Sequence, residues 1–222
     1  MSQMHLMRQW RDIEDFLPPL RTATRGNEDI ADLDDGVLLD FLRDAMIEFC
    51  EDTKVIRHHM EIKIECGVCE YPLMIDTCED ILGVGEVYYG QECHHDCAGD
   101  RSWNWGDVTF RLDEDSDVLR INRAPGDDGK TLHMDVFTAP TREASRVDAL
   151  LYQRYRNPIT YLAMERIHLM VSVPWQSISR AQYYRQLYAK REVEVNERRM
   201  DRGMENRMLV PRVRMGKGRR RF

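Results

Sequence analysis

The sequence predicts an α+β protein: a helical body of about four helices, a small antiparallel β-domain inserted in the middle, and an extended C-terminal arm. Apolar residues recur at helical spacing near both ends of the chain, whereas short runs in the middle alternate apolar and polar residues. The last fifteen residues are basic and too poor in apolar side chains to form a core. Because helices and strands are segregated along the chain, the pattern favours α+β over a doubly wound parallel sheet.

These patterns divide the 222 residues into four parts. N-terminal helices occupy 1–54, and the β-domain occupies 55–140 with a loop insertion at 90–106. C-terminal helices occupy 141–203, and the basic arm occupies 204–222.

In the N-terminal part, residues 7–17 have apolar side chains at helical spacing, and Pro18-Pro19 is expected to stop this helix. A longer helix is predicted from about Gly36 to Glu51. Asp34 and Asp35 precede it and favour its N-terminus by capping and by their charge. Its apolar stripe consists of Leu38, Phe41, Leu42, Ala45, Phe49 and Cys50.

Alternation from Ile56 to Ile64 predicts a half-buried strand, which we expect to form a hairpin with residues 71–75 across a turn at Gly67. Further strands are predicted at 81–89, 108–112, 118–122 and 132–137. The polar and aromatic insertion between Gly90 and Gly106 is predicted to be an exposed loop.

Helical spacing returns from Arg146, and Pro174-Trp175 is expected to end that helix. Ser179 and Gln182 have the spacing of a capping box for a last helix, predicted from Arg180 to about Arg202. Gly203 is expected to stop it.

Charge is distributed unevenly along the chain. The overall formal charge is −7, but residues 188–222 contain twelve Lys/Arg and five Asp/Glu, so the remaining 187 residues carry −14. A basic segment on an acidic body is typical of an interaction tail. The residues expected to bind a partner are Met208, Leu209, Val210, Arg212, Arg214, Lys217, Arg219, Arg220, Arg221 and Phe222.

No signal peptide or membrane-spanning run is evident, so we expect the chain to be made in a cytoplasm.

Two pairs of cysteines leave open a structural zinc site, although ordinary thiols are the simpler interpretation. Cys66 and Cys69 are separated by two residues, and Cys93 and Cys97 by three. His58 and His59 are neighbours that point to opposite faces of their strand, so they are not expected to share a metal ion. No other cofactor is predicted.

The sequence offers no recognisable catalytic constellation, and we expect the chain not to be an enzyme. A hydrolase would need a pair of acids, and Asp76, Glu79, Glu86 and Asp107 could all be nominated without any preference among them.

Three stretches together resemble a known family. They are LLDFLRDAMIEFCEDTKVIRHHMEIKIECGVCEYPL at 38–73, ILGVGEVYYG at 81–90, and an ending with VPW at 173–175, EVNERR at 194–199 and a terminal RRF. The arrangement resembles the head-to-tail adaptor (connector) proteins of tailed bacteriophages, especially short-tailed ones. The departures from the family are the cysteines and the insertion at 90–106.

The resemblance implies a structural virion protein in the neck, between capsid and tail. It implies a homo-oligomeric ring, commonly of twelve copies, which binds the portal protein above and the tail nozzle below. The C-terminal arm would dock on the portal, and double-stranded DNA would pass through the channel without specific binding.

The alternative is a zinc-containing nucleic-acid-binding module with a basic tail. Cys66, Cys69, Cys93, Cys97 and the terminal arginines support it. The acidic body argues against it, since a DNA-binding surface needs clustered cations.

Overall fold

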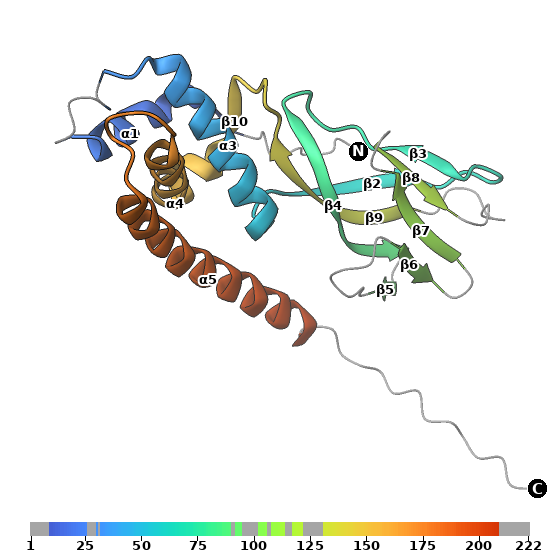
Figure 1. The fold of residues 1–222 in the computed structure, drawn as a ribbon. Helices are drawn as coiled ribbons and strands as arrows, with labels where there is room; N and C mark the ends of the chain where they lie inside the picture. Colours follow the sequence, from blue (N-terminus) through green and yellow to red (C-terminus); the bar gives the residue numbers. More distant parts are fainter. Residues whose placement is uncertain are drawn as a thin grey trace, which may run out of the picture.

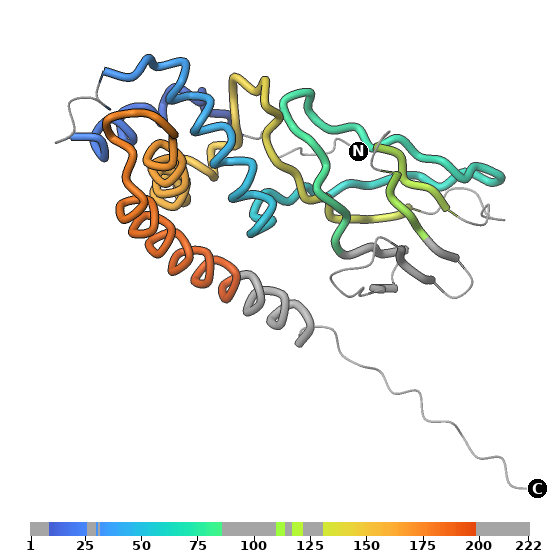
Figure 2. Tube along the Cα trace, viewed as in Figure 1, coloured from blue at the N-terminus to red at the C-terminus, as the bar shows by residue number. Residues whose placement is uncertain are grey.

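In the computed structural model, the backbone is described for residues 9–25, 30, 32–89, 92–94, 102–105, 108–113, 117–121 and 131–208 (Figure 1). Side chains are described for a narrower set, which ends at residue 198 (coloured in Figure 2). The predicted α+β class is confirmed: the elements in these ranges are helices and antiparallel sheets. Of the helices described, none is both long enough and apolar enough to span a membrane.

The helical body lies at one end of the molecule (Figure 1). Its elements, within the described ranges, are η1 (Ile13–Phe16), α1 (Leu17–Ala23), α3 (Asp35–Thr53), α4 (Ala149–Leu169) and α5 (Ile178–Met208). A short antiparallel pair of β1 (Trp10–Asp12) with β10 (Arg146–Asp148) joins the two ends of this body.

The β-domain lies at the other end and contains two antiparallel four-stranded sheets among the described residues. One sheet has the order β2 (Arg57–Lys63), β9 (Thr131–Pro140), β4 (Glu79–Tyr89), β5 (Glu92–His94). The other has the order β3 (Glu70–Pro72), β8 (Val118–Ile121), β7 (Val108–Asp113), β6 (Ser102–Trp105). Their inner faces share one apolar core, so the two sheets form a sandwich.

Each part of the molecule has its own core. In the helical body, buried residues of α3 and α4 such as Phe49 and Leu162 pack with Tyr188 of α5. In the sandwich, Leu132, Met134 and Val136 of β9 pack against the second sheet. Strand β9 also sends Ala139 into the helical core, so one continuous strand takes part in both.

Local interactions explain where α3 begins and ends. The Asp34 carboxylate accepts a hydrogen bond of 2.7 Å from the Gly36 N–H, as expected of an N-cap. Lys54 follows the helix with a φ of 49°, and its N–H donates to the Cys50 carbonyl at 2.7 Å. The left-handed backbone at this position ends the helix as a C′ residue does.

Two N-terminal predictions are wrong. The predicted helix at 7–17 is instead β1 followed by η1 within the described residues. Pro18-Pro19 does not stop a helix but lies in the first turn of α1. Proline is well suited to this position, because the N–H it lacks has no partner in the first turn and its fixed φ is already helical.

The strand predictions at 56–64, 81–89, 108–112, 118–122 and 132–137 are confirmed to within a few residues by β2, β4, β7, β8 and β9. The predicted hairpin is wrong, since β2 pairs with β9 and β3 pairs with β8 in the other sheet. The insertion is not wholly loop, because β5 pairs with β4 and β6 pairs with β7.

Three C-terminal boundaries also differ from prediction. Residues 146–148 form β10, so α4 begins only at Ala149. The cap of α5 is Ser177, whose Oγ accepts the Arg180 N–H at 3.4 Å, and Ser179 already lies inside the helix. Helix α5 continues through Gly203 to Met208, so residues 204–208 belong to the helix and not to an extended arm.

Candidate functional site

Helix α5 is a long helix whose first part packs on the helical body. Its 31 residues span about 46 Å at 1.5 Å per residue. Ala181 and Tyr188 are buried against the body, whereas Glu197 and Arg198 are exposed. In Figure 1, α5 leaves the body and continues away from it. A helix this polar depends for its stability on the buried side chains of its first half.

Tyr188 joins α5 to the core of the body. Its ring is fully buried and meets Phe49 edge-on, with 6.4 Å between ring centroids. Its O–H donates a hydrogen bond of 2.6 Å to an Asp52 carboxylate oxygen. Burial raises the pKa of Tyr188, and its bond to Asp52 raises it further. The phenol therefore stays protonated and remains a hydrogen-bond donor.

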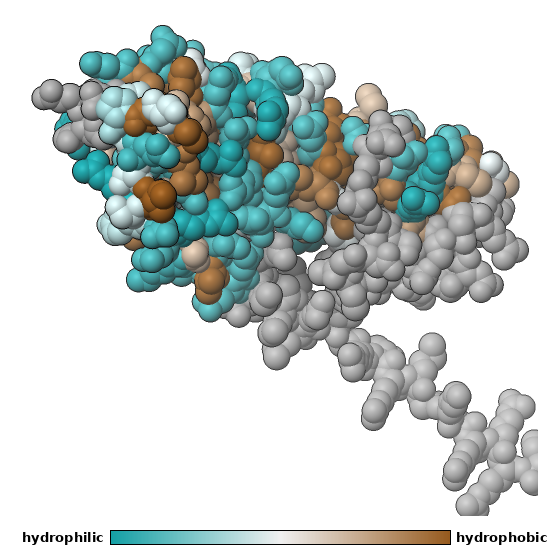
Figure 3. Space-filling model, viewed as in Figure 1, coloured by the Kyte–Doolittle hydropathy of each residue, from teal (hydrophilic) through white to brown (hydrophobic). Residues whose placement is uncertain are grey.

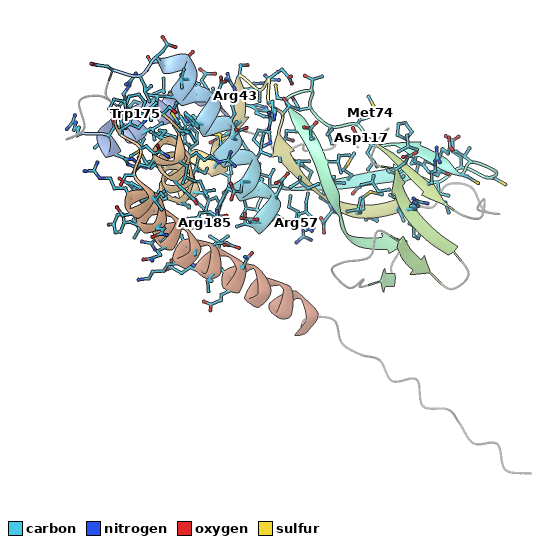
Figure 4. The ribbon with its side chains drawn as sticks, in the orientation of Figure 1. Arg43, Arg57, Met74, Asp117, Trp175 and Arg185 are labelled. Carbon is cyan, nitrogen blue, oxygen red and sulfur yellow. The ribbon has the colours of Figure 1, made fainter. Side chains whose placement is uncertain are left out.

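An ionic network reinforces the same junction. Glu48 of α3 accepts from Arg166 of α4 at 2.6 Å and from Arg185 of α5 at 2.7 Å. Arg185 extends from α5 toward α3 (Figure 4) and also lies 3.5 Å from Glu165. Burial alone would raise the pKa of Glu48, but the two arginine hydrogen bonds outweigh it and lower that pKa. The carboxylate is thus ionised and connects three helices.

The turn between α4 and α5 carries exposed apolar side chains. Leu169, Val171, Ile178 and Tyr183 are 48, 77, 63 and 57% exposed. The face of the body drawn in Figure 3 is mostly hydrophilic, with hydrophobic patches around this turn. Such a patch on a folded surface is typical of a protein–protein contact.

Most residues predicted to bind a partner lie outside the described part of the chain. Met208 is described as the last residue of α5, and the other nine, from Leu209 to Phe222, fall beyond it. The described structure therefore fixes the helix that leads to the arm and leaves the role of the arm a prediction.

The cysteines proposed as zinc ligands belong to different elements of the β-domain. Cys66 and Cys69 lie in the connection between β2 and β3, whereas Cys93 lies in β5. The described residues give no distance between the two pairs, so the zinc site stays a prediction. Cys97 lies outside the described residues. Burial raises the pKa of the Cys50 thiol, so Cys50 is an unreactive core residue.

Of the acids that could be nominated for catalysis, two are described with partners in different places. Asp76 pairs with Arg146 at 3.1 Å, and Glu79 lies 3.1 Å from His58 Nε2. The side chain of Glu86 and all of Asp107 lie outside the described residues. The two residues lie in one turn, where the Glu79 N–H donates to the Asp76 carbonyl at 3.0 Å, but their carboxylates have different partners.

A different group of side chains does come together, on the outer face of the first sheet. His59, Glu61 and His133 offer metal-ligand atoms that all lie within 4.8 Å of one another. The sequence pattern placed His59 correctly on the face opposite His58 but did not pair it with His133. The two histidines are distant in sequence, and only the β2–β9 register brings them together.

Comparison with known proteins adds no identification: no protein-family model matches the chain, and no curated protein matches its sequence.

Proposed function

We propose that this chain is a non-enzymatic structural subunit of a ring that joins the portal vertex of a tailed bacteriophage to its tail. In the virion neck the ring would line the DNA exit channel, and each subunit would be anchored to the portal through its C-terminus. The observation that carries the proposal is α5, a long helix fixed at one end and leading into the basic residues 209–222.

The way α5 is attached supports an anchoring role. Tyr188 and the Glu48 network fix its first half to α3 and α4, so a force on its far end reaches the body. The second half of α5 and the residues after it contain both apolar and basic side chains. A segment of this composition can order on a partner and contribute apolar as well as charged contacts.

Charge and symmetry are consistent with the same role. A body with a formal charge of −14 would repel DNA phosphates, so the genome could slide through the channel without adhering. In a ring of twelve copies, a modest contact by each arm becomes strong attachment by avidity. The apolar side chains around the α4–α5 turn provide surface for a protein contact within such an assembly.

Removal of residues 209–222 tests the proposal. We expect the truncated chain to keep the helix content of the full chain, because α4 and the buried half of α5 are unchanged. We expect its binding to the portal ring encoded by the same genome to weaken at least about a hundredfold, because all arms are lost together. Native mass spectrometry of the mixture, with and without the truncation, measures the number of copies bound.

A charge-matched control separates sequence-specific docking from simple attraction. It replaces the five arginines of residues 209–222 with lysine, which keeps the charge but removes the planar bidentate donors. Intermediate binding by this variant would support specific docking. Normal portal binding by the truncated chain would exclude the arm as the anchor, and absence of any complex with the full chain would refute the adaptor role.

A further inference from the structure

The outer face of the β2–β9 pair places two imidazoles and a carboxylate side by side. In this antiparallel pair Glu61 lies opposite His133, and His59 lies opposite Asp135. Side chains alternate along a strand, and the neighbours Ile62 and Met134 pack toward the sandwich core. The four polar residues therefore share the opposite face, where they are adjacent without any rearrangement of the backbone.

The distances within the group are close to those of a metal site. The Glu61 carboxylate oxygen lies 3.4 Å from His133 Nδ1 and 3.9 Å from His59 Nε2. The two imidazole rings are stacked, with 5.6 Å between their centroids and 17° between their planes. Ligand atoms bound to one zinc ion at about 2.0–2.2 Å lie roughly 3–4 Å apart, so small side-chain rotations suffice.

Asp135 provides the outer contact that metal-binding histidines usually have. Its side chain is only 4% exposed, and its Oδ1 lies 3.4 Å from His59 Nδ1. Its other carboxylate oxygen is paired with Arg57, which lies at the start of β2 (Figure 4). A carboxylate at Nδ1 keeps the proton on that nitrogen, so the Nε2 lone pair is free and faces Glu61.

We propose that His59, Glu61 and His133 bind one divalent transition-metal ion of the Zn²⁺ class, with Asp135 as a positioning residue. Two imidazoles and one carboxylate form a donor set that such ions favour. Three protein ligands leave a coordination position for water or for a side chain of another molecule. The ligands are 53, 46 and 30% exposed, so the ion can enter from solvent. This site is independent of the cysteines and of the adaptor function.

Calorimetric titration of the full chain with Zn²⁺ tests the proposal, together with the near-ultraviolet and visible spectrum of the Co²⁺ form. We expect one ion per chain in a complex without thiolate-to-cobalt charge-transfer bands. His133→Gln and, separately, Glu61→Gln should weaken binding at least about tenfold. Both side chains are partly exposed, and circular dichroism checks that each variant is folded.

The matched control replaces Cys66 and Cys69 with serine, which removes the competing thiolate pair and leaves β2 and β9 intact. We expect this variant to bind Zn²⁺ with the affinity of the unmodified chain. Asp135→Asn should weaken binding by about tenfold, while the stoichiometry stays at one ion. Three results would each overturn the site: unchanged affinity in His133→Gln, loss of binding in the cysteine variant, or no binding of one ion per chain.

Discussion

The helical body and the β-sandwich are stabilised by different kinds of interaction. The body has the larger described core and adds a network of buried and half-buried polar groups where α3, α4 and α5 meet. The sandwich is held mainly by apolar packing between its sheets, and its clustered polar side chains lie on an outer face. The polar groups of the body therefore hold α5 against α3 and α4, whereas the clustered polar groups of the sandwich lie on its surface.

The two cores are nevertheless mechanically continuous, because β9 supplies Met134 to one and Ala139 to the other. If packing is lost in either core, β9 loses its fixed position, and the other core then loses the side chains that β9 contributes to it. We therefore expect the described part of the chain to unfold as one cooperative unit, with the helical body contributing more of its stability.

Identical substitutions in the two cores test this comparison and should have the largest effect. Phe49 is fully buried and its ring lies 5.2 Å from that of Tyr155 and 6.4 Å from that of Tyr188, whereas Phe110 of the sandwich is 3% exposed. We expect Phe49→Ala to lower the free energy of unfolding by about 4–5 kcal/mol and Phe110→Ala by about 3 kcal/mol. Urea denaturation of each variant measures both.

The same experiment has two informative failures. An equal or greater loss in Phe110→Ala would mean that the sandwich, and not the body, dominates stability. Separate transitions by circular dichroism and by fluorescence would mean that β9 does not couple the two cores.

Local patterns explain what was predictable in these two regions. The alternation from Ile56 to Ile64 and the apolar stripe of α3 give the correct period because burial on one face dictates it. Partner choice between strands is not local. Strand β2 does not pair with β3, the next strand in the sequence, but with β9, about 70 residues later. Residue spacing alone therefore could not exclude the predicted hairpin or reveal that His59 lies near His133.

Ambiguous residues account for the remaining errors. Proline can end a helix or begin one. At Pro18-Pro19 it begins α1, because Phe16 and Leu20 on either side are buried in the core when these residues are helical. Glycine usually follows a helix, but Gly203 lies inside α5, where the sequence alone predicted a stop. The composition of the C-terminal residues predicted the arm as a candidate site. The structure shows the helix, α5, that leads to it.

Removal of one charge from the polar network should have a smaller effect than loss of a core aromatic ring. Glu48→Gln keeps the shape of the side chain but leaves Arg166 and Arg185 without their shared carboxylate. We expect the free energy of unfolding to fall by about 1–2 kcal/mol. Hydrogen exchange should show the largest increase along α5, since Glu48 is one of its attachments to α3.

Asp40→Asn is the matched control, because Asp40 also pairs with an arginine, Arg43, but its side chain is 78% exposed. We expect this variant to differ from the unmodified chain by less than about 0.5 kcal/mol. If both variants lost the same free energy of unfolding, removal of any negative charge would explain the loss, and the position of Glu48 between three helices would not.

The smallest expected effect is a pH dependence that originates at the α4–α5 turn. His168 is 1% exposed, its ring stacks on Tyr184 at 5.8 Å, and its Nδ1 lies 3.2 Å from the Trp175 carbonyl oxygen. Burial lowers the pKa of His168, the hydrogen bond to the Trp175 carbonyl opposes this in part, and the positive charge of Arg180 lowers the pKa further. The folded state therefore takes up this proton at lower pH than the unfolded state does.

Stability from this source is complete above the unfolded pKa of about 6.5 and declines as the pH falls through the folded pKa. His168→Gln, which can still donate to the Trp175 carbonyl, should flatten that decline relative to the unmodified chain. Thermal unfolding of both chains between about pH 8 and pH 5 measures the difference, in which the contributions of the other histidines cancel. Parallel curves would contradict the expectation. If the stability of the variant fell more steeply with falling pH, protonated His168 would stabilise the α4–α5 turn. The positive charge of His168 would then help to hold the exposed apolar side chains beside it in place.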